Sequence, residues 1–342
     1  MLEYFLRRLL LVIPTFVGIT LLVFAITRVV PGGPIERMMT QSLQMSGDKR
    51  AAASTANTRT GNTLSAEQLA QLNAYYGFDQ PTLVSYGKWL WRVLHLDLGS
   101  STRYHDPVWT LIKERFPVSI FYGVTTLILT YGICIPLGIA KAVRHGSRFD
   151  NASSVLVFLG YAVPSYVVSI ALILTFAAHL DWFPLGGFSG DDFENLSFGK
   201  KIGDVIYHAA LPLTAYLAGS FAVTTLMMKN ALMDNLSADY MRTAMAKGHD
   251  FSSAVHKHAL RNSLIPIATS FGNNISLLLS GSFLIETIFN IDGIGLLGFE
   301  SVLERDYPVV MGILVISALL FLIGNILSDL CVALVDPRIR FV

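Results

Sequence analysis

The sequence has few charged residues and almost no cysteine. Asp, Glu, Lys and Arg make up 14% of its 342 residues, where an ordinary soluble domain carries about 25%. The two cysteines, Cys134 and Cys331, lie inside apolar runs, so neither a disulfide framework nor a cysteine-based metal site is expected. Together with long apolar runs, the shortage of charge predicts a membrane protein.

Nucleotide-binding and metal-binding motifs are also lacking. No G-x-x-x-x-G-K-[ST] occurs, so the chain is not expected to hydrolyse ATP through a P-loop. Residues 293–298 fit G-x-G-x-x-G but follow an apolar run without a βαβ unit, and we interpret them as a glycine-rich bend between spans. His256 and His258 have no suitably spaced acidic third ligand, so no metal site is expected.

Six segments are long and apolar enough to cross a bilayer, which takes roughly 20 residues each. Several contain prolines, which membrane helices tolerate where neighbouring groups satisfy the freed carbonyls. The stretch from Leu9 to Val30 is too long for the apolar part of a signal peptide. The predicted fold class is an all-α polytopic membrane protein with six transmembrane helices, at residues 7–30, 117–140, 153–179, 206–229, 264–288 and 308–334.

Basic residues occur in alternate short loops. The loops 141–151 and 229–262 carry Lys and Arg, whereas the loops 181–205 and 290–307 are rich in Asp and Glu. Because cytoplasmic loops carry an excess of Lys and Arg, both termini and the segment between the fourth and fifth spans are predicted to be cytoplasmic. The counted basic residues are Arg7, Arg8, Lys141, Arg144, Arg148, Lys229, Arg242, Lys247, Lys257, Arg261, Arg338 and Arg340.

The long outer loop, residues 31–116, divides into two parts. Residues near 40–65 are small and polar and are typical of a flexible excursion. From Ala66 onward the sequence is patterned and rich in aromatic residues, which indicates either a small packed cap at the membrane surface or only an interfacial belt. These aromatic residues are Tyr75, Tyr76, Tyr86, Trp89, Trp91, Tyr104 and Trp109.

The segment between the fourth and fifth spans is longer and more patterned than a plain loop. Its first half, Asp239 to Lys247, fits about two helical turns with Tyr240, Met241, Ala244 and Met245 on one face. Ser237 and Asp239 suit the N-terminal end of this helix, and Gly248 suits its C-terminal stop. A helix of about eight residues is not stable alone in water, so it must rest on lipid, on the protein's own spans or on a partner.

A second short helix is predicted after the Gly-His-Asp break. Asp250 can cap its N-terminus, and Pro266 marks a turn or kink near the start of the next span. One stripe of this helix contains Phe251, Ala254, Val255, His258, Ala259 and Asn262.

The stretch DYMRTAMAKG…HALRNSLIP, residues 239–266, resembles the conserved cytoplasmic loop of binding-protein-dependent ABC importer permeases. The version in the dipeptide/oligopeptide branch is close to DYVRTARAKG…HALRNALIP, from which Met241 and Met245 depart conservatively. Gly248 and Pro266 match the glycine and the closing proline of that motif. The segments VVPGGP, YYGFDQP, YGKWL and LDLGSS, with residues 286–310 and 325–341, also resemble the family.

Within this family, the PGGPIERM start and the polar insert look most like the B-type permease of the Yej-type importer, which takes up oligopeptides and peptide antibiotics such as microcin C. The resemblance implies a type I ABC importer permease (MetI-like) fold that works by alternating access. It also implies a heterodimer with a second homologous permease, a periplasmic peptide-binding protein, and cytoplasmic ABC ATPase domains, separate or fused, that hold the ATP and Mg. This chain would have no catalytic residues and bind no cofactor.

The resemblance also implies a division of the chain in the bacterial inner membrane. An N-terminal transmembrane helix (1–30) precedes the periplasmic loop or cap (31–116). The ABC permease transmembrane domain (117–334) contains a cytoplasmic coupling segment (237–263), and a cytoplasmic tail follows (335–342). Within residues 237–248, the implied coupling helix, the candidates for contact with the ATPase are Asp239, Tyr240, Arg242, Thr243, Lys247 and Gly248.

Five polar side chains within the predicted spans are further candidates. Asn273 and Asn274, midway along the fifth span, either reach a peptide backbone or bond neighbouring helices. Glu286, near the outer end of that span, either lines the pathway or gate or makes a structural hydrogen bond. Asn325 and Asp329 lie four residues apart on one face of the sixth span, where a structural role is favoured.

Two other classes of protein fit the sequence less well than a permease does. A proton- or ion-coupled carrier needs a relay of ionisable residues in mid-span, and only one or two occur, near the span ends. A membrane enzyme needs an acid/base pair or a set of metal ligands near one face, and none is evident. The sequence therefore favours one half of a peptide importer.

Overall fold

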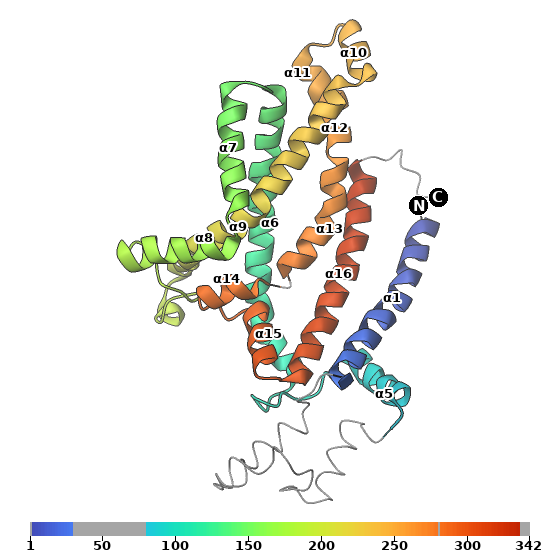
Figure 1. Cartoon of the computed structure of the whole chain (residues 1–342), viewed down its shortest axis with the longest axis vertical. Coiled ribbons are helices and arrows are strands. Elements are labelled where there is room, and N and C mark those ends of the chain that lie inside the picture. Colours follow the sequence, from blue (N-terminus) through green and yellow to red (C-terminus); the bar gives the residue numbers. More distant parts are fainter. Residues whose placement is uncertain (1, 30–79, 280, 336–342) are drawn as a thin grey trace, which may run out of the picture. The chain divides into compact units, whose positions relative to one another are not determined.

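The computed structural model describes residues 2–29, 80–279 and 281–335. Within those ranges the chain folds into helices joined by turns, and extended pairing is limited to an isolated bridge between Ser100 and Pro107 (Figure 1). The predicted all-α fold class is confirmed. Tyr75, Tyr76 and the polar insert near 40–65 lie outside the described residues.

Four helices in the described part of the chain are long and apolar enough to cross a membrane. Prolines lie inside three of them, at Pro14, Pro117, Pro136 and Pro212, and the helices continue through these positions. These helices correspond to the first, second, fourth and sixth predicted spans. They are α1 (Leu2–Val29), α6 (Val108–Val143), α9 (Phe198–Ser237) and α16 (Tyr307–Val335).

The third predicted span is not one continuous helix. α7 (Arg148–Ala162) is followed by α8 (Ser165–Leu172) and the π-helix η1 (Ile173–His179), and the chain bends by 94° between them (Figure 1). Val163 is extended, with φ −97° and ψ 120°, because the ring of Pro164 disfavours helical backbone at the residue before it. Proline here ends the helix.

The fifth predicted span is also divided. α13 (Ile265–Leu279) is 15 residues long, or about 22 Å, which is shorter than a hydrocarbon core of about 30 Å. A separate helix, α14 (Phe283–Ile288), follows it. The described residues thus provide four spans by length and composition, or five if the bent pair counts as one, and the count of six is not confirmed.

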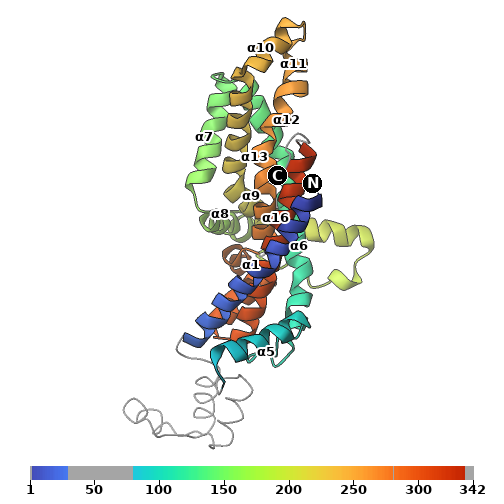
Figure 2. The same ribbon diagram turned by 90° about the vertical axis from the view of Figure 1, so that its right-hand side faces the viewer.

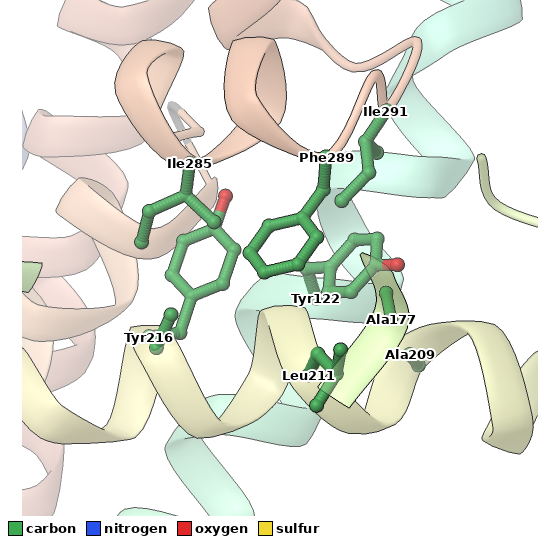
Figure 3. Close-up of a cluster of buried hydrophobic side chains, with 9 residues drawn as sticks. Tyr122, Ala177, Ala209, Leu211, Tyr216, Ile285, Phe289 and Ile291 are labelled. Carbon is green, nitrogen blue, oxygen red and sulfur yellow. The ribbon is translucent and has the colours of Figure 1, made fainter. Parts of the chain in front are cut away.

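Contacts divide the chain into two compact units. The first consists of residues 1–12, 115–297 and 319–342, and the second of residues 13–114 and 298–318. One core of the first unit joins α6, η1, α9 and α14, where Tyr122 stacks on Tyr216 with ring centroids 5.8 Å apart (Figure 3). The buried residues of this core are Tyr122, Ala177, Ala209, Leu211, Ala215, Tyr216, Ile285, Phe289 and Ile291.

Small residues bring α13 and α16 into backbone contact in the first unit. A Cβ atom on Gly272 would collide with the carbonyl group of Gly324. Ser276 donates a hydrogen bond to the carbonyl of Leu320 across the same contact, at 3.0 Å. Membrane helices pack in this way because small side chains let two backbones approach closely.

The second unit contains the short helix α5 (Thr82–Leu94) and the loop that leads into α6. Both the hydroxyl of Ser101 and the backbone N–H of Arg103 donate to the buried carboxylate of Asp306, just before α16. Glu300, in α15 (Ile294–Leu303), accepts a hydrogen bond from Arg103 at 2.7 Å. The carboxylates of Glu300 in α15 and Asp306 before α16 therefore hold the loop that precedes α6.

Candidate functional site

The segment 237–263, called the coupling segment below, forms the predicted helix–break–helix. α9 ends at Ser237, and Ala238 is extended with ψ 150°. α10 (Asp239–Ala246) follows at once, and both views show α10 and α11 together beyond the end of α7 (Figures 1 and 2). The second half is α11 (Phe251–Ala254), the π-helix η3 (Val255–Ala259) and α12 (Leu260–Ser263).

One face of α10 is attached to the protein's own helices. Met241 is only 1% exposed and Ala244 is also buried. They pack in one cluster with Leu232 of α9 and Val255 of η3. Tyr240 and Met245, which the sequence placed on the same face, are 38% and 44% exposed. Met241 and Ala244 are the buried residues of α10, and at the edge of this contact the Tyr240 hydroxyl donates a hydrogen bond to Asn235 of α9.

The other face of α10 is polar and uncovered. Asp239 and Arg242 lie 3.8 Å apart, with side chains 97% and 78% exposed, so this ion pair contributes little to stability. Thr243 donates to the carbonyl of Asp239, and Lys247 is exposed at the C-terminal end. The helix therefore presents a charged surface with an edge formed by the exposed side chains of Tyr240 and Met245.

Gly248 reverses the chain after α10. Its φ is +90°, while a Cβ atom there would meet nothing within 4 Å. Glycine is needed at this position for backbone conformation, because other residues pay a steric penalty at positive φ. Asp250 then caps the next helix by accepting from Ser253 N–H at 3.2 Å, as predicted. The expected cap on α10 is absent, since its N-cap residue is Ala238, which makes no side-chain hydrogen bond.

The two neighbouring asparagines of α13 have different surroundings. Asn274 donates to the hydroxyl of Tyr131 on α6 at 3.0 Å, so it joins two helices. Asn273 is exposed and makes no hydrogen bond within the described ranges. It shares one exposed side of α13 with Thr269 and Pro266, at the helical spacing i, i+3 and i+7.

Glu286 is held inside the first unit and is 2% exposed. It accepts from the N–H groups of Ser282 at 3.2 Å and Leu296 at 2.8 Å, and from the hydroxyl of Tyr216 at 3.3 Å. A Cβ atom on Gly293 or Gly295 would lie 2.5 or 2.9 Å from its Oε2. Residues 293–298 are not the glycine-rich bend expected from the sequence, because α15 begins at Ile294 and contains Gly295 and Gly298. Gly293 and Gly295 leave the space that the Glu286 carboxylate occupies.

Asp329 of α16 is paired with Arg8 of α1, with Nε and Oδ2 3.0 Å apart. Asn325 lies one turn earlier on α16 and is half-buried. A carboxylate within a membrane span is costly unless it is paired. The ion pair with Arg8 provides that partner and joins α16 to α1, so Asp329 has a structural explanation.

A buried ion cluster of Lys141, Asp150 and Lys229 was missed by sequence reasoning. Lys141 was counted as a loop residue, but it lies in α6 and is 0% exposed. Its Nζ donates to Asp150 O at 2.9 Å and lies 3.1 Å from Oδ1. Lys229 of α9 donates to both carboxylate oxygens at 2.8 Å.

The cluster fixes the α6–α7 turn against α9. Ser153 and Ser154 accept the remaining hydrogen bonds of Lys141, each at 2.8 Å. A local signal existed, because Ser147 accepts from Asp150 N–H and caps α7. Such a cap predicts a helix start, and hence a turn short enough to bring Lys141 close to Asp150.

Comparison with known proteins identifies the family. Residues 134–341 match the family described as "Binding-protein-dependent transport system inner membrane component". The chain is 40% identical to the inner membrane ABC transporter permease protein YejB of Escherichia coli O157:H7, over 99% of this chain and 98% of that protein.

Two further relatives also match this chain along nearly its whole length. The peptidoglycan transport system permease protein YejB of Agrobacterium fabrum is 40% identical over 99% of this chain and 98% of its own length. The dipeptide transport system permease protein DppB of Escherichia coli K12 is 34% identical over 99% of both chains. The resemblance seen in residues 239–266 is confirmed: the chain belongs to the family of inner-membrane permease components of binding-protein-dependent transport systems.

Proposed function

We propose that this chain is a permease subunit of an ATP-driven importer for peptides, including dipeptides, oligopeptides and peptide antibiotics such as microcin C. The main support is the match along 98% or more of both chains to permeases named for dipeptide and peptidoglycan transport. Peptidoglycan fragments carry peptide stems, so backbone amides are the chemistry that these substrates share.

The importer would contain a second homologous permease, two ATPase domains that bind ATP and Mg, and a periplasmic peptide-binding protein. The permease pair would open alternately to either side of the membrane. Under this proposal both termini and the coupling segment are cytoplasmic, in keeping with the Lys and Arg of the short loops.

Coupling would take place through α10. Its exposed residues would enter an ATPase groove, while Met241 and Ala244 attach it to α9 and η3. Because packed interiors deform little, a displacement of α10 would be passed to α9 as a push on this cluster. The proposed contacts are Asp239, Tyr240, Arg242, Thr243 and Lys247, with Gly248 as the turn that presents them.

Asn273 is the residue of α13 that we assign to the peptide pathway. An amide side chain both donates and accepts hydrogen bonds, as a peptide backbone requires, and Asn273 is exposed. Asn274 and Glu286, which were also pathway or gate candidates, are bonded inside the fold. They would support the pathway wall without touching the peptide.

Uptake by the reconstituted importer tests this function. The chain is reconstituted in vesicles alone and with its partner permease, ATPases and binding protein, and uptake of a labelled oligopeptide is measured. We expect uptake only in the complete complex with ATP, with competition from dipeptides and from peptidoglycan stem peptides. Uptake by this chain alone along a proton gradient would overturn the proposal.

The coupling proposal is tested at Gly248 and Arg242. Gly248→Val and Arg242→Glu are expected to separate ATP hydrolysis from uptake while the protein still inserts. Gly248→Asn should retain more transport, because asparagine tolerates positive φ better than a β-branched residue. Arg148→Glu, at an exposed cation outside the coupling segment, serves as the control. Normal uptake and ATPase stimulation in Gly248→Val would refute this role.

A further inference from the structure

We infer that α5 lies within the membrane interface and binds phospholipid headgroups along one side. The inference does not depend on the proposed transport function; it requires only that the chain is a membrane component, as its family shows. Two observations support this placement. The helix has a packed, an apolar and a basic sector, and its packed sector contacts α1.

The first sector of α5 is its packed face. Ser85, Tyr86 and Val93 are buried. The hydroxyl of Tyr86 donates to Val17 O of α1 at 3.0 Å and bonds Thr20 Oγ1 at 2.9 Å. These contacts fix which sides of α5 face outward.

The depth of this contact follows from its partners on α1. Val17, Thr20 and Phe24 all lie inside the apolar stretch Leu6–Ile26 of α1. The ring of Phe24 lies 5.6 Å from that of Tyr86 and 5.5 Å from that of Trp89. Thr20 is six residues before Ile26, or about 9 Å along the axis. The packed face of α5 therefore reaches a part of α1 that lies within the hydrocarbon region.

The second sector is apolar and uncovered. Leu83, Gly87, Trp91 and Leu94 follow one another at i, i+4, i+8 and i+11 and so share one side of the helix. Leu83 is 73%, Trp91 66% and Leu94 63% exposed. Tryptophan is enriched where membrane meets water, so this sector is suited to the edge of the hydrocarbon.

The third sector, next to the apolar one, is basic. Lys88, Arg92 and His95 are spaced i, i+4 and i+7 and are exposed. No Asp or Glu occurs in Thr82–Leu94, and neither Lys88 nor Arg92 has an ion-pair partner among the residues that the structure describes. Lysine and arginine stems can lie along apolar surface while their charges reach phosphate groups. A basic side beside an apolar one is typical of a helix that lies in the interface plane.

Lipid is the occupant that fits these sectors. The apolar sector belongs to a helix packed on α1, whose residues Leu22 and Ile26 are also well exposed, so it continues the lipid-facing surface of that span. A soluble partner would have to reach the edge of the hydrocarbon to cover Trp91. The leaflet concerned is the one at the C-terminal end of α1, which is the periplasmic leaflet in the proposed orientation.

Fluorescence of Trp91 tests this placement. The full chain is reconstituted in vesicles of phosphatidylethanolamine and phosphatidylglycerol, and the emission of Trp91 is taken as the difference between the wild type and Trp91→Phe. We expect bromine-labelled phospholipid to remove most of this emission and aqueous iodide to remove little. Quenching by iodide alone would overturn the inference, and so would protection from both quenchers, which would mean that protein covers the helix.

A charge-reversal variant tests the headgroup contact. In Lys88→Glu/Arg92→Glu we expect weaker quenching of Trp91 by bromine-labelled lipid and stronger quenching by iodide. The change should be larger in vesicles with phosphatidylglycerol than in those made of phosphatidylcholine alone, because anionic headgroups repel the new carboxylates. Lys113→Glu, at an exposed lysine outside α5, is the control. An unchanged emission in the double variant would contradict headgroup binding.

Discussion

Asp150 and Glu286 are both buried carboxylates of the first unit, yet their charges are balanced in different ways. Asp150 faces the ammonium groups of Lys141 and Lys229. Glu286 bonds backbone N–H groups and a tyrosine hydroxyl, with no cation among its described hydrogen-bond partners. Each is 2% exposed, so burial alone does not decide which kind of partner a carboxylate has.

A buried carboxylate can be stabilised in two ways: by nearby positive charge, or by space that lets N–H groups reach it. Asp150 is stabilised by opposite charge, because the buried Lys141 and the partly buried Lys229 need a counter-ion as much as the carboxylate does. Glu286 is stabilised by space, because N–H groups can reach the carboxylate only where Gly293 and Gly295 carry no side chain. Removal of a charge should therefore be most damaging at Asp150. Removal of space should be most damaging around Glu286.

The largest effect is expected for Asp150→Asn. Removing one member of a buried ion pair costs about 3–5 kcal/mol, because the remaining charge stays buried without a partner. The free energy of unfolding in mixed micelles should fall by this amount. His145→Ala is the matched control, since His145 contacts the same carboxylate at 3.2 Å with a side chain that is 58% exposed; there we expect about 0–1 kcal/mol. Equal losses in the two variants would contradict the role given to charge.

Gly295→Ala should have the next largest effect. The added methyl group would lie 2.9 Å from Glu286 Oε2 and 2.8 Å from Phe283 N, and overpacking of this kind costs about 1–3 kcal/mol. Gly132→Ala in α6 is the control, because its Cβ would meet nothing within 4 Å. In a helix it should gain up to about 1 kcal/mol. Unfolding of both variants is measured under the same conditions, and a stabilised Gly295→Ala would show that space does not limit the Glu286 site.

Glu286→Gln should cost less than either Asp150→Asn or Gly295→Ala. Glutamine keeps the shape and one acceptor oxygen, so we expect a loss of about 1 kcal/mol, close to one hydrogen bond. Unfolding of Glu286→Gln and Asp150→Asn measured side by side sharpens the comparison. If Glu286→Gln proved the more damaging, charge would matter at both sites.

The smallest effect on stability is expected at Asn273, which we compare with its neighbour Asn274. Asn274→Leu removes the hydrogen bond to Tyr131 and should cost about 1 kcal/mol. Asn273→Leu removes no bond within the described part of the chain, so its unfolding should be unchanged while peptide uptake falls. A loss of stability at Asn273 with normal uptake would reverse the two assignments.

The coupling segment was largely predictable because its signals are local. Gly248 and Asp250 act through their own backbone and through N–H groups a few residues away, and such chemistry is visible in the sequence. The bend at Pro164 was less visible. A proline in an apolar run is compatible with a kinked helix or with an ended one, and only the packing around it selects the 94° turn.

The sequence by itself determined that the chain is helical, resides in a membrane and belongs to its permease family, because composition, helical spacing and motifs are properties of neighbouring residues. Tertiary structure alone decided that Lys141 is buried, that Asp150 meets Lys229, and that Asn273 and Asn274 face different surroundings. Asp150 and Lys229 are separated by 79 positions in the chain. Buried polar groups need hydrogen-bond partners. When the partners are far apart in the sequence, the packing of whole helices decides which groups come into contact.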